Sequence, residues 1–291
     1  MTIAGEGNRI DSHTALYGVI GDPIRHSKSP IMMNRAFRET GINGAYMAFH
    51  VTNDRLSEFI AGIRAMGVRG VNVTIPHKLD VMAFLDEIDD GARALGAVNT
   101  IVNDNGRLIG YNTDGIGYVR SLKEEAASSL ESKRIVVIGA GGAARGIVFA
   151  LSGEKPGRMT IVNRSVARAS ELAEAFSNRA DIAALPPEQL QEACSDADIV
   201  INTTMIGMFP NTDASPLDAS WLKPGTVVSD IVYNPLKTKL LQEAEERGCI
   251  IHGGLGMFVY QGAYAFEYWT GRPAPTAAMR EVVTAALLGQ V

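Results

Sequence analysis

Strand-like and helix-like segments alternate along this 291-residue chain, and the alternation begins twice. In the first series, three apolar segments of strand length are each followed by a segment in which apolar residues have helical spacing. Strands that alternate with helices in this way indicate βαβ units and a mostly parallel sheet. We therefore expect an α/β fold, with strands at 15–21, 45–51 and 69–75 and helices at 29–41, 53–67 and 76–88.

A hairpin and a polar stretch interrupt this pattern. Residues 97–115 are expected to form two strands that turn at Asn105-Gly106, a dipeptide typical of tight hairpins. A second α/β series follows, so the boundary between two units lies between Asp114 and Lys133. In this second series we expect strands at 134–139, 158–165, 197–204, 225–233 and 249–254 and helices at 142–153 and 166–178.

The segment 257–271 is apolar on nearly every helical face, and Glu267 is its only charged residue. A helix of this kind is normally surrounded by protein. We expect it to lie between the two domains and to touch both. The last helix, at 276–291, is expected to pack back on the first domain.

Composition narrows the function classes. Hydrophobic residues make up 46% and charged residues 20%, as in ordinary globular proteins, and the net charge of −5 argues against a nucleic-acid-binding protein. The longest apolar run, 135–144, is too short to span a membrane, and residues 1–13 lack the apolar core of a secretory signal. Two cysteines form neither a disulfide framework nor a zinc site, so no metal is expected and the cytoplasm is the expected compartment.

A glycine-rich turn opens the second series. Gly139, Gly141 and Ala144 have the G-x-G-x-x-A spacing, directly after an expected strand and at the start of an expected helix. Gly139 permits the tight turn, and Gly141 lets a pyrophosphate approach the backbone at the helix N-terminus. The pattern favours a dinucleotide site, although a glycine-rich turn without a ligand has the same sequence.

The end of the next strand indicates which dinucleotide is bound. NAD sites usually carry an acidic residue there, which binds the ribose 2′-hydroxyl. Here the strand ends in Asn163, Arg164 and Ser165, without an acid, and Arg168 follows one helical turn after Arg164. Two guanidinium groups on one face suit a phosphate, so NADP is the expected cofactor, unless both arginines are only solvated surface residues.

Nine motifs in this order resemble those of the shikimate dehydrogenase family. They are GDPIRHSKSP, NVTIPHK, GAVNT, GYNTDG, GAGGAARG, NRS..RA, INTT..GM, VYNP and QGAYAFEYWTG. The resemblance runs from about Leu16 to the C-terminus. It implies NADPH-dependent reduction of 3-dehydroshikimate to shikimate, in the pathway to aromatic amino acids. It also implies a substrate domain at 1–113 plus 255–291, a Rossmann NADP domain at 114–254, and a cleft between them.

The resemblance also assigns the catalytic pair. Lys78 and Asp114 match the lysine and aspartate that flank the reacting hydroxyl in the family. Hydride transfer to a ketone leaves charge on oxygen, which an ammonium group stabilises and can protonate. A nearby carboxylate would orient the lysine, and the pair titrates as a unit, so the formal acid/base stays open. Without Asp114, a solvated lysine would be the better interpretation of Lys78.

The remaining site residues are implied by the resemblance. Ser27, Ser29 and Tyr233 match residues near the substrate carboxylate, and Ser29 is also a candidate N-cap. Thr74, Asn99 and Gln261 match contacts to ring hydroxyls, although Asn99 could equally brace the backbone, and His77 is expected to be structural. The expected cofactor residues are Gly139, Ala140, Gly141, Gly142, Ala143, Asn163, Arg164, Ser165, Arg168, Thr203, Met208, Ile231, Gly254 and Met257.

Two departures from the family pattern and several alternatives remain. Met33 stands where histidine is frequent, and Met205 stands where proline is frequent, which affects the cofactor loop more than the reaction. A quinate or aminoshikimate dehydrogenase that uses NAD, or a non-catalytic NADP-binding sensor, would share the fold. A folate-type dehydrogenase would not explain HSKSP or NTDG. The expected partners are small molecules, with no nucleic acid or membrane, and the protein is a monomer or homodimer.

Overall fold

The computed structural model describes residues 10–290, and these divide into two compact units. Unit 1 runs to Thr113 and resumes at Gly262, and unit 2 comprises Asp114–Gln261. The chain passes back from unit 2 to unit 1 within the continuous helix α9 (Leu255–Thr270). Residues 1–9, most of the segment examined for a secretory signal, lie outside the described residues.

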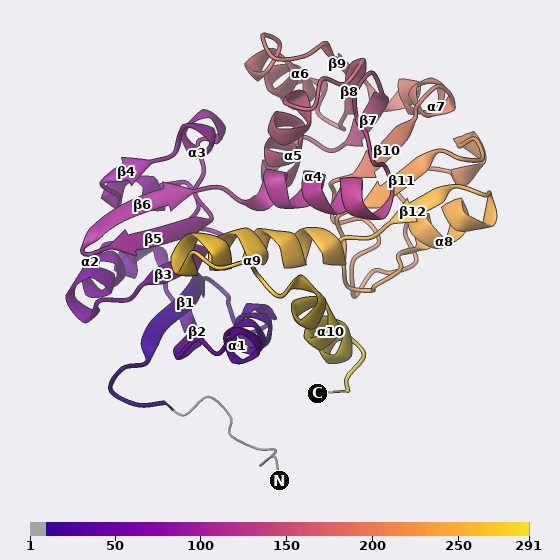
Figure 1. Ribbon diagram of the computed structural model, residues 1–291. Coiled ribbons are helices and arrows are strands. Elements are labelled where there is room, and N and C mark those ends of the chain that lie inside the picture. Colours follow the sequence, from indigo (N-terminus) through magenta and orange to yellow (C-terminus); the bar gives the residue numbers. More distant parts are fainter. Residues whose placement is uncertain (1–9, 291) are drawn as a thin grey trace. The chain divides into compact units, whose positions relative to one another are not determined.

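Unit 1 contains a mixed six-stranded sheet, and the unit's ribbon is drawn in Figure 1. The strand order is β2 (Gly44–His50), β1 (Ala15–Gly21), β3 (Gly70–Val73), β5 (Thr100–Asp104), β6 (Arg107–Tyr111) and β4 (Glu87–Ile88). β1 is parallel to β2 and β3, whereas β5 is antiparallel to β3 and β6. The predicted hairpin is confirmed: Asn105 and Gly106 have φ of 51° and 97°.

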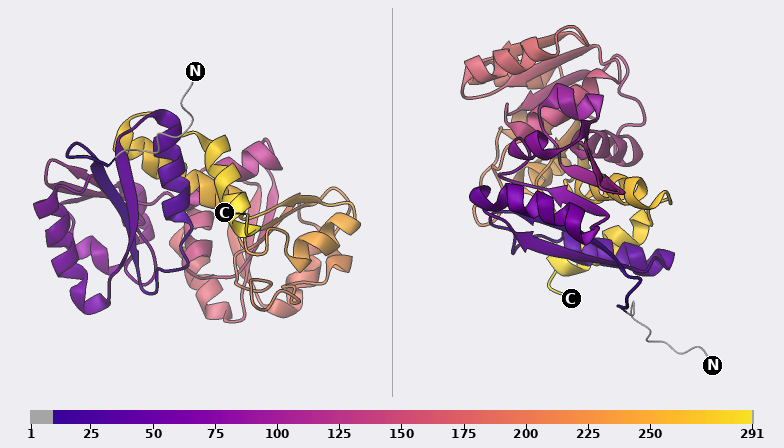
Figure 2. Two further views of the ribbon diagram at one scale, coloured as in Figure 1. Left: turned by 90° about the horizontal axis from the view of Figure 1, so that it is seen from below. Right: turned by 90° about the vertical axis from the view of Figure 1, so that its left-hand side faces the viewer.

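The first two helices of unit 1 end where the sequence predicts. α1 (Ser29–Thr40) and α2 (Leu56–Met66, preceded by the 3₁₀ turn η1, Asn53–Arg55) stop at Gly41 and Gly67, which both adopt the left-handed conformation that glycine favours. α10 (Thr276–Leu287) packs against α1, as expected (Figure 2). A short helix, α3 (Asp90–Leu95), is capped by the Asp89 side chain.

The helix predicted at 76–88 is wrong. Residues 76–79 form turns, η2 (Asp80–Phe84) is a 3₁₀ helix, and Glu87–Ile88 are strand β4. A helix through Ile88 would forbid the pairing of β4 with β6, and Asp86 N already donates to Leu108 O. Within η2 only Val81 is buried, so the segment lacks the apolar stripe that stabilises a longer helix.

Unit 2 contains an all-parallel sheet in the doubly wound order. Across the sheet lie β12 (Ile250–His252), β11 (Val227–Asp230), β10 (Ile199–Asn202), β7 (Arg134–Ile138), β8 (Arg158–Val162) and β9 (Ile182–Leu185). The strand order reverses between β7 and β10. In open α/β sheets, ligands bind at the carboxyl ends of the strands at such a switch point.

The helices of unit 2 are α4 (Asp114–Glu125), α5 (Gly142–Ser152), α6 (Val166–Ala175), α7 (Leu190–Ser195) and α8 (Lys239–Glu246), with 3₁₀ turns at Pro187–Gln189 and Ala219–Trp221. The core on one side of the sheet contains Val136, Val200, Val228, residues of α7 and α8, and both buried cysteines, Cys194 in α7 and Cys249 directly before β12. Among residues 10–290, no helix is long and apolar enough to cross a bilayer, and no cluster of His, Cys, Asp or Glu could hold a metal.

A buried carboxyl group joins the carboxyl ends of β10 and β11. Asp230 accepts hydrogen bonds from Asn202 Nδ2 (3.0 Å), Val232 N (3.0 Å) and Thr238 Oγ1 (2.7 Å). Burial raises the pKa of Asp230 from 3.8 to about 6, against these donors, which lower it. Between about pH 4 and about pH 6, the folded state therefore keeps a proton on Asp230 that the unfolded chain has released.

This proton predicts a pH dependence of stability. Because the folded pKa is raised, the Asp230 contribution favours folding at low pH and is lost as pH rises from about 4 to about 6. Asp230→Asn, which keeps the shape and the acceptor oxygen, should remove this loss. Urea unfolding at pH 4.5 and pH 7 should show the variant gaining about 2 kcal/mol relative to the parent chain over this interval. If the free energies of unfolding of the two proteins differ by the same amount at pH 4.5 and at pH 7, the pKa of Asp230 is not raised.

Candidate active site

The turn from β7 to α5 has the geometry of an anion site. Gly139 has φ of 114°, and a methyl group there would lie 2.5 Å from Thr203 Oγ1, at the end of β10. Methyl groups at Gly141 or Gly142 would meet nothing within 4 Å, so the backbone there faces open space. Gly141 precedes α5 without a side-chain cap, which leaves the N–H groups of the first helical turn for a ligand. Ala140 and Ala143 are half-buried in the same turn, so these residues fit a pyrophosphate.

The end of β8 presents basic residues beside this turn. Gly139 N donates to Val162 O (2.8 Å), which holds the two strand ends together. Ser165 caps α6 by accepting from Arg168 N, and Asn163 Nδ2 donates to Ser165 O (2.9 Å). Arg164 and Arg168 are exposed, and among residues 10–290 neither guanidinium has a carboxylate partner. The arrangement suits an additional phosphate on the ribose.

The other expected cofactor residues follow the carboxyl ends of the neighbouring strands. Thr203 is buried, and its Oγ1 donates to Ile138 O (2.7 Å). Ile231 N donates to Asn202 O (3.1 Å), and Gly254 packs so closely on the Ile231 carbonyl that no side chain fits. Met208 is partly exposed in the loop after β10, and Met257 lies in the first turn of α9.

Lys78 and Thr113 are fixed to neighbouring residues within unit 1. Lys78 O accepts from Val98 N (2.8 Å), and Asn99 Oδ1 accepts from Thr113 N (2.9 Å). The Asn99 amide group also donates to Thr113 Oγ1 (3.0 Å), so Asn99 does brace the backbone. Asp114 follows Thr113 directly and is the first residue of α4. Unit 1 thus positions both the Lys78 backbone and the residue that precedes Asp114.

The stretch around Lys78 is anchored at the end of β3. Thr74 N donates to Ile20 O (3.0 Å), and His77 N donates to Thr74 O (3.0 Å). His77 is fully buried, and its Nε2 lies 2.6 Å from Val51 O, so it is structural, as predicted. The Lys78 side chain, by contrast, is only half-buried.

Two glycines in the first turns of α4 position Asp114 within unit 2. Gly115 packs on the Gly146 carbonyl in α5, at a distance that excludes any side chain. A methyl group at Gly117 would lie 2.7 Å from Gln261 N in α9. The helix that begins at Asp114 therefore contacts both the dinucleotide-turn helix and the backbone of an expected substrate residue.

Gln261 and Tyr233 lie on or against α9. Gln261 is half-buried, and its Nε2 donates to Phe258 O (2.8 Å), one turn earlier. The Tyr233 ring stacks on Phe258 with ring centroids 5.0 Å apart. Burial raises the pKa of Tyr233, so its phenol remains a hydrogen-bond donor at neutral pH.

The start of α1 corrects one expectation. Ser29 is the first helical residue and not the N-cap, which is Lys28 without a side-chain capping bond. Ser29 N instead donates to Ser27 Oγ (3.2 Å), so the Ser27 hydroxyl satisfies this backbone group. Ser29 itself is buried, with 9% of its surface exposed.

Comparison with known proteins identifies the family. Residues 19–101 match the model of the shikimate dehydrogenase substrate binding domain, residues 121–209 the shikimate/quinate 5-dehydrogenase model, and residues 254–284 the shikimate 5′-dehydrogenase C-terminal domain. The shikimate dehydrogenase (NADP(+)) of Geobacillus sp. (strain WCH70) is 51% identical over 94% of this chain and 99% of its own length. The chain belongs to the shikimate dehydrogenase family.

Solved structures of the family share the whole fold. A shikimate dehydrogenase in complex with NADP⁺ superimposes with a TM-score of 0.90 at 41% identity, over 97% of this chain and 99% of that one. The Listeria monocytogenes shikimate 5-dehydrogenase, solved with shikimate and NAD, has a TM-score of 0.89 at 41% identity, over 94% and 98% of the two chains. The expected two-domain α/β fold is confirmed.

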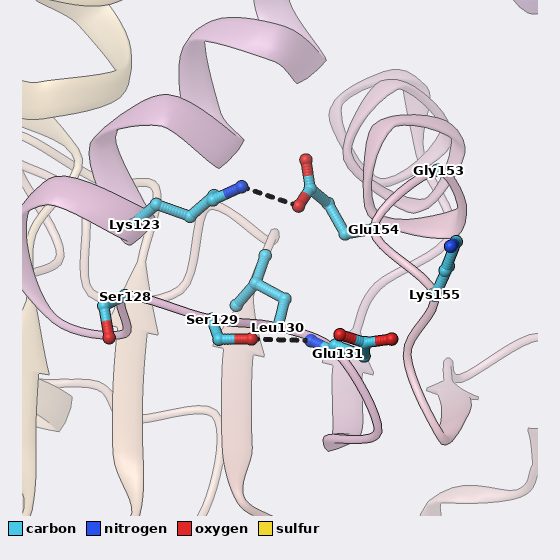
Figure 3. A pocket seen from close by; sticks show the side chains of 8 residues that line it. All are labelled: Lys123, Ser128, Ser129, Leu130, Glu131, Gly153, Glu154 and Lys155. Atoms are coloured by element: carbon cyan, nitrogen blue, oxygen red, sulfur yellow. Dashed lines mark hydrogen bonds and ion pairs between the residues drawn. The ribbon is translucent and has the colours of Figure 1, made fainter.

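Two pockets of unit 2 lie away from the residues expected in a shikimate dehydrogenase site. One, of about 270 Å³, lies between the end of α4 and the end of α5, where Lys123 pairs with Glu154 at 2.8 Å (Figure 3). The other, of about 550 Å³, is lined by residues at the amino ends of β7, β10 and β11. No residue expected to bind substrate or cofactor lines either pocket.

Sequence reasoning missed three buried polar residues of unit 1. Tyr46, Asn72 and Thr113 are at most 8% exposed and are hydrogen-bonded in one network with Asn99. Asn72 and Thr113 fall inside motifs of the family, NVTIPHK and GYNTDG, and a buried amide always needs partners. For Tyr46 the sequence carried no comparable signal.

Proposed function

We propose that this chain catalyses the reversible NADPH-dependent reduction of 3-dehydroshikimate to shikimate. The observation that carries the proposal is that hydrogen bonds within unit 1 hold both the Lys78 backbone and Thr113. Consecutive residues, Val98 and Asn99, hold the Lys78 backbone and Thr113, directly before Asp114. A non-catalytic NADP sensor would need neither this bracing nor the lysine–aspartate pair. Residues 1–113 plus 255–291 form the proposed substrate domain and 114–254 the NADP domain.

Lys78 and Asp114 act on the same hydroxyl in this proposal. NADPH, when bound, supplies the hydride. The Lys78 ammonium donates a hydrogen bond to the substrate carbonyl oxygen, stabilises the negative charge that develops there, and delivers the proton. The Asp114 carboxylate flanks the same oxygen and orients the ammonium. Because the two groups interact, the proton belongs to the pair.

The other residues hold the substrate by its polar groups. Ser27, Ser29 and Tyr233 bind the carboxylate, and Thr74, Asn99 and Gln261 bind ring hydroxyls. Fixing an anionic ring at two ends orients the carbonyl for transfer and supplies much of the rate enhancement expected from positioning. For Asn99, the brace to Thr113 leaves the side chain rigid, as a hydroxyl contact requires.

The geometry of unit 2 supports the cofactor site that we propose. The turn at residues 139–143 binds the pyrophosphate, the basic end of β8 (Asn163, Arg164, Ser165, Arg168) binds the 2′-phosphate, and Thr203, Met208, Ile231, Gly254 and Met257 border the nicotinamide half. The partners are thus small molecules. We further propose a cytoplasmic monomer or homodimer that binds neither nucleic acid nor membrane.

Arg164→Ala should separate the two dinucleotides. Loss of a charge-assisted contact to the 2′-phosphate should raise KM for NADPH by about 10-fold or more, while KM for NADH changes little. Arg158→Ala, an exposed arginine at the opposite end of β8, is the matched control. Equal weakening of both dinucleotides by Arg164→Ala would refute its assignment to the phosphate.

Initial-rate assays test the function itself. The purified chain should oxidise shikimate with NADP much faster than quinate with NADP, and faster than either acid with NAD. Faster turnover of quinate with NAD would support the quinate alternative. No turnover in any of the four combinations, with NADP binding retained, would support the sensor.

A further inference from the structure

A buried histidine lies at the junction between β12 and α9 in unit 2. His252, the last residue of β12, is 2% exposed and is paired in the sheet with Ser229 of β11. Its Nδ1 lies 2.8 Å from Ser229 Oγ, and its Nε2 lies 2.7 Å from Ser121 Oγ in α4. Both serines are fully buried, so water does not compete for these hydrogen bonds. The ring therefore connects the carboxyl end of the sheet with a helix packed beside it.

The neighbouring hydrogen bonds determine which ring nitrogen carries the proton. Ser121 Oγ donates its only proton to Glu125 Oε1 (3.1 Å), so it accepts from His252 Nε2. Nδ1 of the neutral ring is then an acceptor. Ser229 Oγ accepts from Tyr118 OH (2.8 Å) and donates its own proton to Nδ1. Because both ring nitrogens are bonded, the orientation of the imidazole is fixed.

The residues that follow β12 have little rigidity of their own. Gly253, Gly254 and Gly256 occupy three of the next four positions, and glycine loses more conformational freedom on folding than any other residue. The Ile231 carbonyl leaves no room for a side chain at Gly254, and Ser121 Oγ leaves none at Gly256. The junction must therefore be rich in glycine to pack, and contacts from neighbouring elements must restrict it.

One hydroxyl group contacts both ends of this junction. Ser121 Oγ accepts from His252 before the glycines and lies against Gly256 after them. Gly254 lies between these two points, and Met257 follows directly in the first turn of α9. These are the two residues of the junction that border the nicotinamide half of the cofactor in the proposed function. The contacts of His252 and Ser121 thus define the backbone path at that half of the site.

We propose that His252 is a positioning residue for the nicotinamide half of the NADP site, and that it acts through the backbone of residues 253–257. The proposal rests on the proposed function, which places Gly254 and Met257 beside the nicotinamide. With both ring hydrogen bonds made, the junction is ordered before the cofactor binds. When one bond is lost, only a fraction of the molecules hold the junction in its binding-competent form, and the apparent affinity falls by that fraction.

Ser121→Ala tests the proposal, because it removes the partner of Nε2 with the smallest change of shape. The dissociation constant for NADP, measured by calorimetry, should rise by about 3-fold to 10-fold, the worth of one hydrogen bond. Adenosine 2′,5′-bisphosphate, which has the ribose phosphate but no nicotinamide, should bind as tightly as it does to the parent chain. Bound NADP orders the junction, so KM for NADP should rise while kcat at saturating NADP stays unchanged.

Two further variants make the result specific. His252→Asn keeps an acceptor in the place of Nδ1 but does not reach Ser121, so it should weaken NADP binding as Ser121→Ala does. The double variant should bind no more weakly than either single one, because both remove the same bond. Ser152→Ala is the matched control: Ser152 is a buried helical serine of unit 2 that accepts from Arg179 Nε (2.8 Å) and donates to Phe149 O (2.7 Å). It should leave the binding of both ligands unchanged.

The two ligands distinguish positioning from a general loss of stability. Equal weakening of NADP and the bisphosphate by Ser121→Ala, or no weakening of NADP, would overturn the proposal. Effects of Ser121→Ala and His252→Asn that multiply in the double variant would also contradict it. Should His252→Asn not fold, Ser121→Ala and its control give the answer alone.

These measurements also separate this proposal from the proposed function. If the parent chain binds NADP but does not oxidise shikimate, the function fails, and the role of His252 is still decided by the binding constants. If the parent chain oxidises shikimate with NADP and Ser121→Ala binds both ligands as the parent does, the function stands and the role of His252 fails. A parent chain that does not bind NADP would overturn both.

Discussion

A Lys78→Met variant is expected to oxidise shikimate about 1,000-fold more slowly in kcat than the parent chain, within the range for loss of a group that transfers a proton and stabilises charge. Methionine has an unbranched side chain only one atom shorter than that of lysine, but it cannot donate a hydrogen bond or carry charge. The alkoxide that forms during reduction of 3-dehydroshikimate would then be stabilised only by its remaining neighbours.

The measurement is a single-turnover rate, which isolates the chemical step from product release. NADPH binding, followed by fluorescence, should be retained, because the dinucleotide turn lies in unit 2 and Lys78 lies in unit 1. Lys155→Met makes the same chemical change at an exposed residue and should have no effect on the rate. If Lys78→Met retains a tenth or more of the parent rate, Lys78 is not the proton-transferring group.

Asp114→Asn is expected to lower kcat by about 100-fold or more. The amide keeps the shape and one acceptor oxygen, but it lacks the negative charge that attracts the Lys78 ammonium and shares its proton in the proposed mechanism. Asp114 is also the first residue of α4, where a negative charge interacts favourably with the helix dipole. Stability should therefore fall slightly as well, by about 0.5 kcal/mol.

Asp90→Asn is the control that separates the effect on kcat from the effect on stability. Asp90 is the first residue of α3, so it loses the same helix-dipole interaction at a site with no proposed chemistry. Its stability should fall as in Asp114→Asn, whereas kcat should equal that of the parent chain. An Asp114→Asn enzyme with near-normal kcat would remove the carboxylate from the mechanism.

Most strands of the two sheets were predictable because they are short and largely apolar. β1 and β7 are continuous apolar segments ended by glycine, and Asn105-Gly106 fixes the only conformation that a two-residue turn of this kind allows. The glycine turn was predictable for the same reason: Gly139 needs a positive φ, and the sequence supplies glycine there.

Prediction from the sequence failed where tertiary contacts override the local preference for a helix or a strand. α4 was missed because Gly115 and Gly117 lower its intrinsic helix propensity, and only the close packing on α5 and α9 explains them. β9 is half-buried throughout and α7 is only six residues long, so neither has a strong periodic signal. The false helix at 76–88 has helical spacing, but β4 must pair with β6.

Within the candidate site, too, residues in local motifs were predictable and residues linked only by tertiary contacts were not. Lys78, Asp114 and the two serines lie in contiguous motifs and could be named from the sequence. Tyr46 lies in the edge strand β2, and its buried hydrogen bonds are made with Asn34 and Asn72, residues distant in the sequence. Buried hydrogen bonds of this kind leave no local pattern in the sequence.

The most direct test of the account is a double-mutant cycle on kcat with Lys78→Met and Asp114→Asn. If the two side chains act as one unit on one hydroxyl, the double variant should be no more than about 10-fold slower than Lys78→Met alone, because the second change removes a partner that has already lost its function. If the two losses instead multiply in full, to about 100,000-fold, the groups act independently and the shared role is wrong.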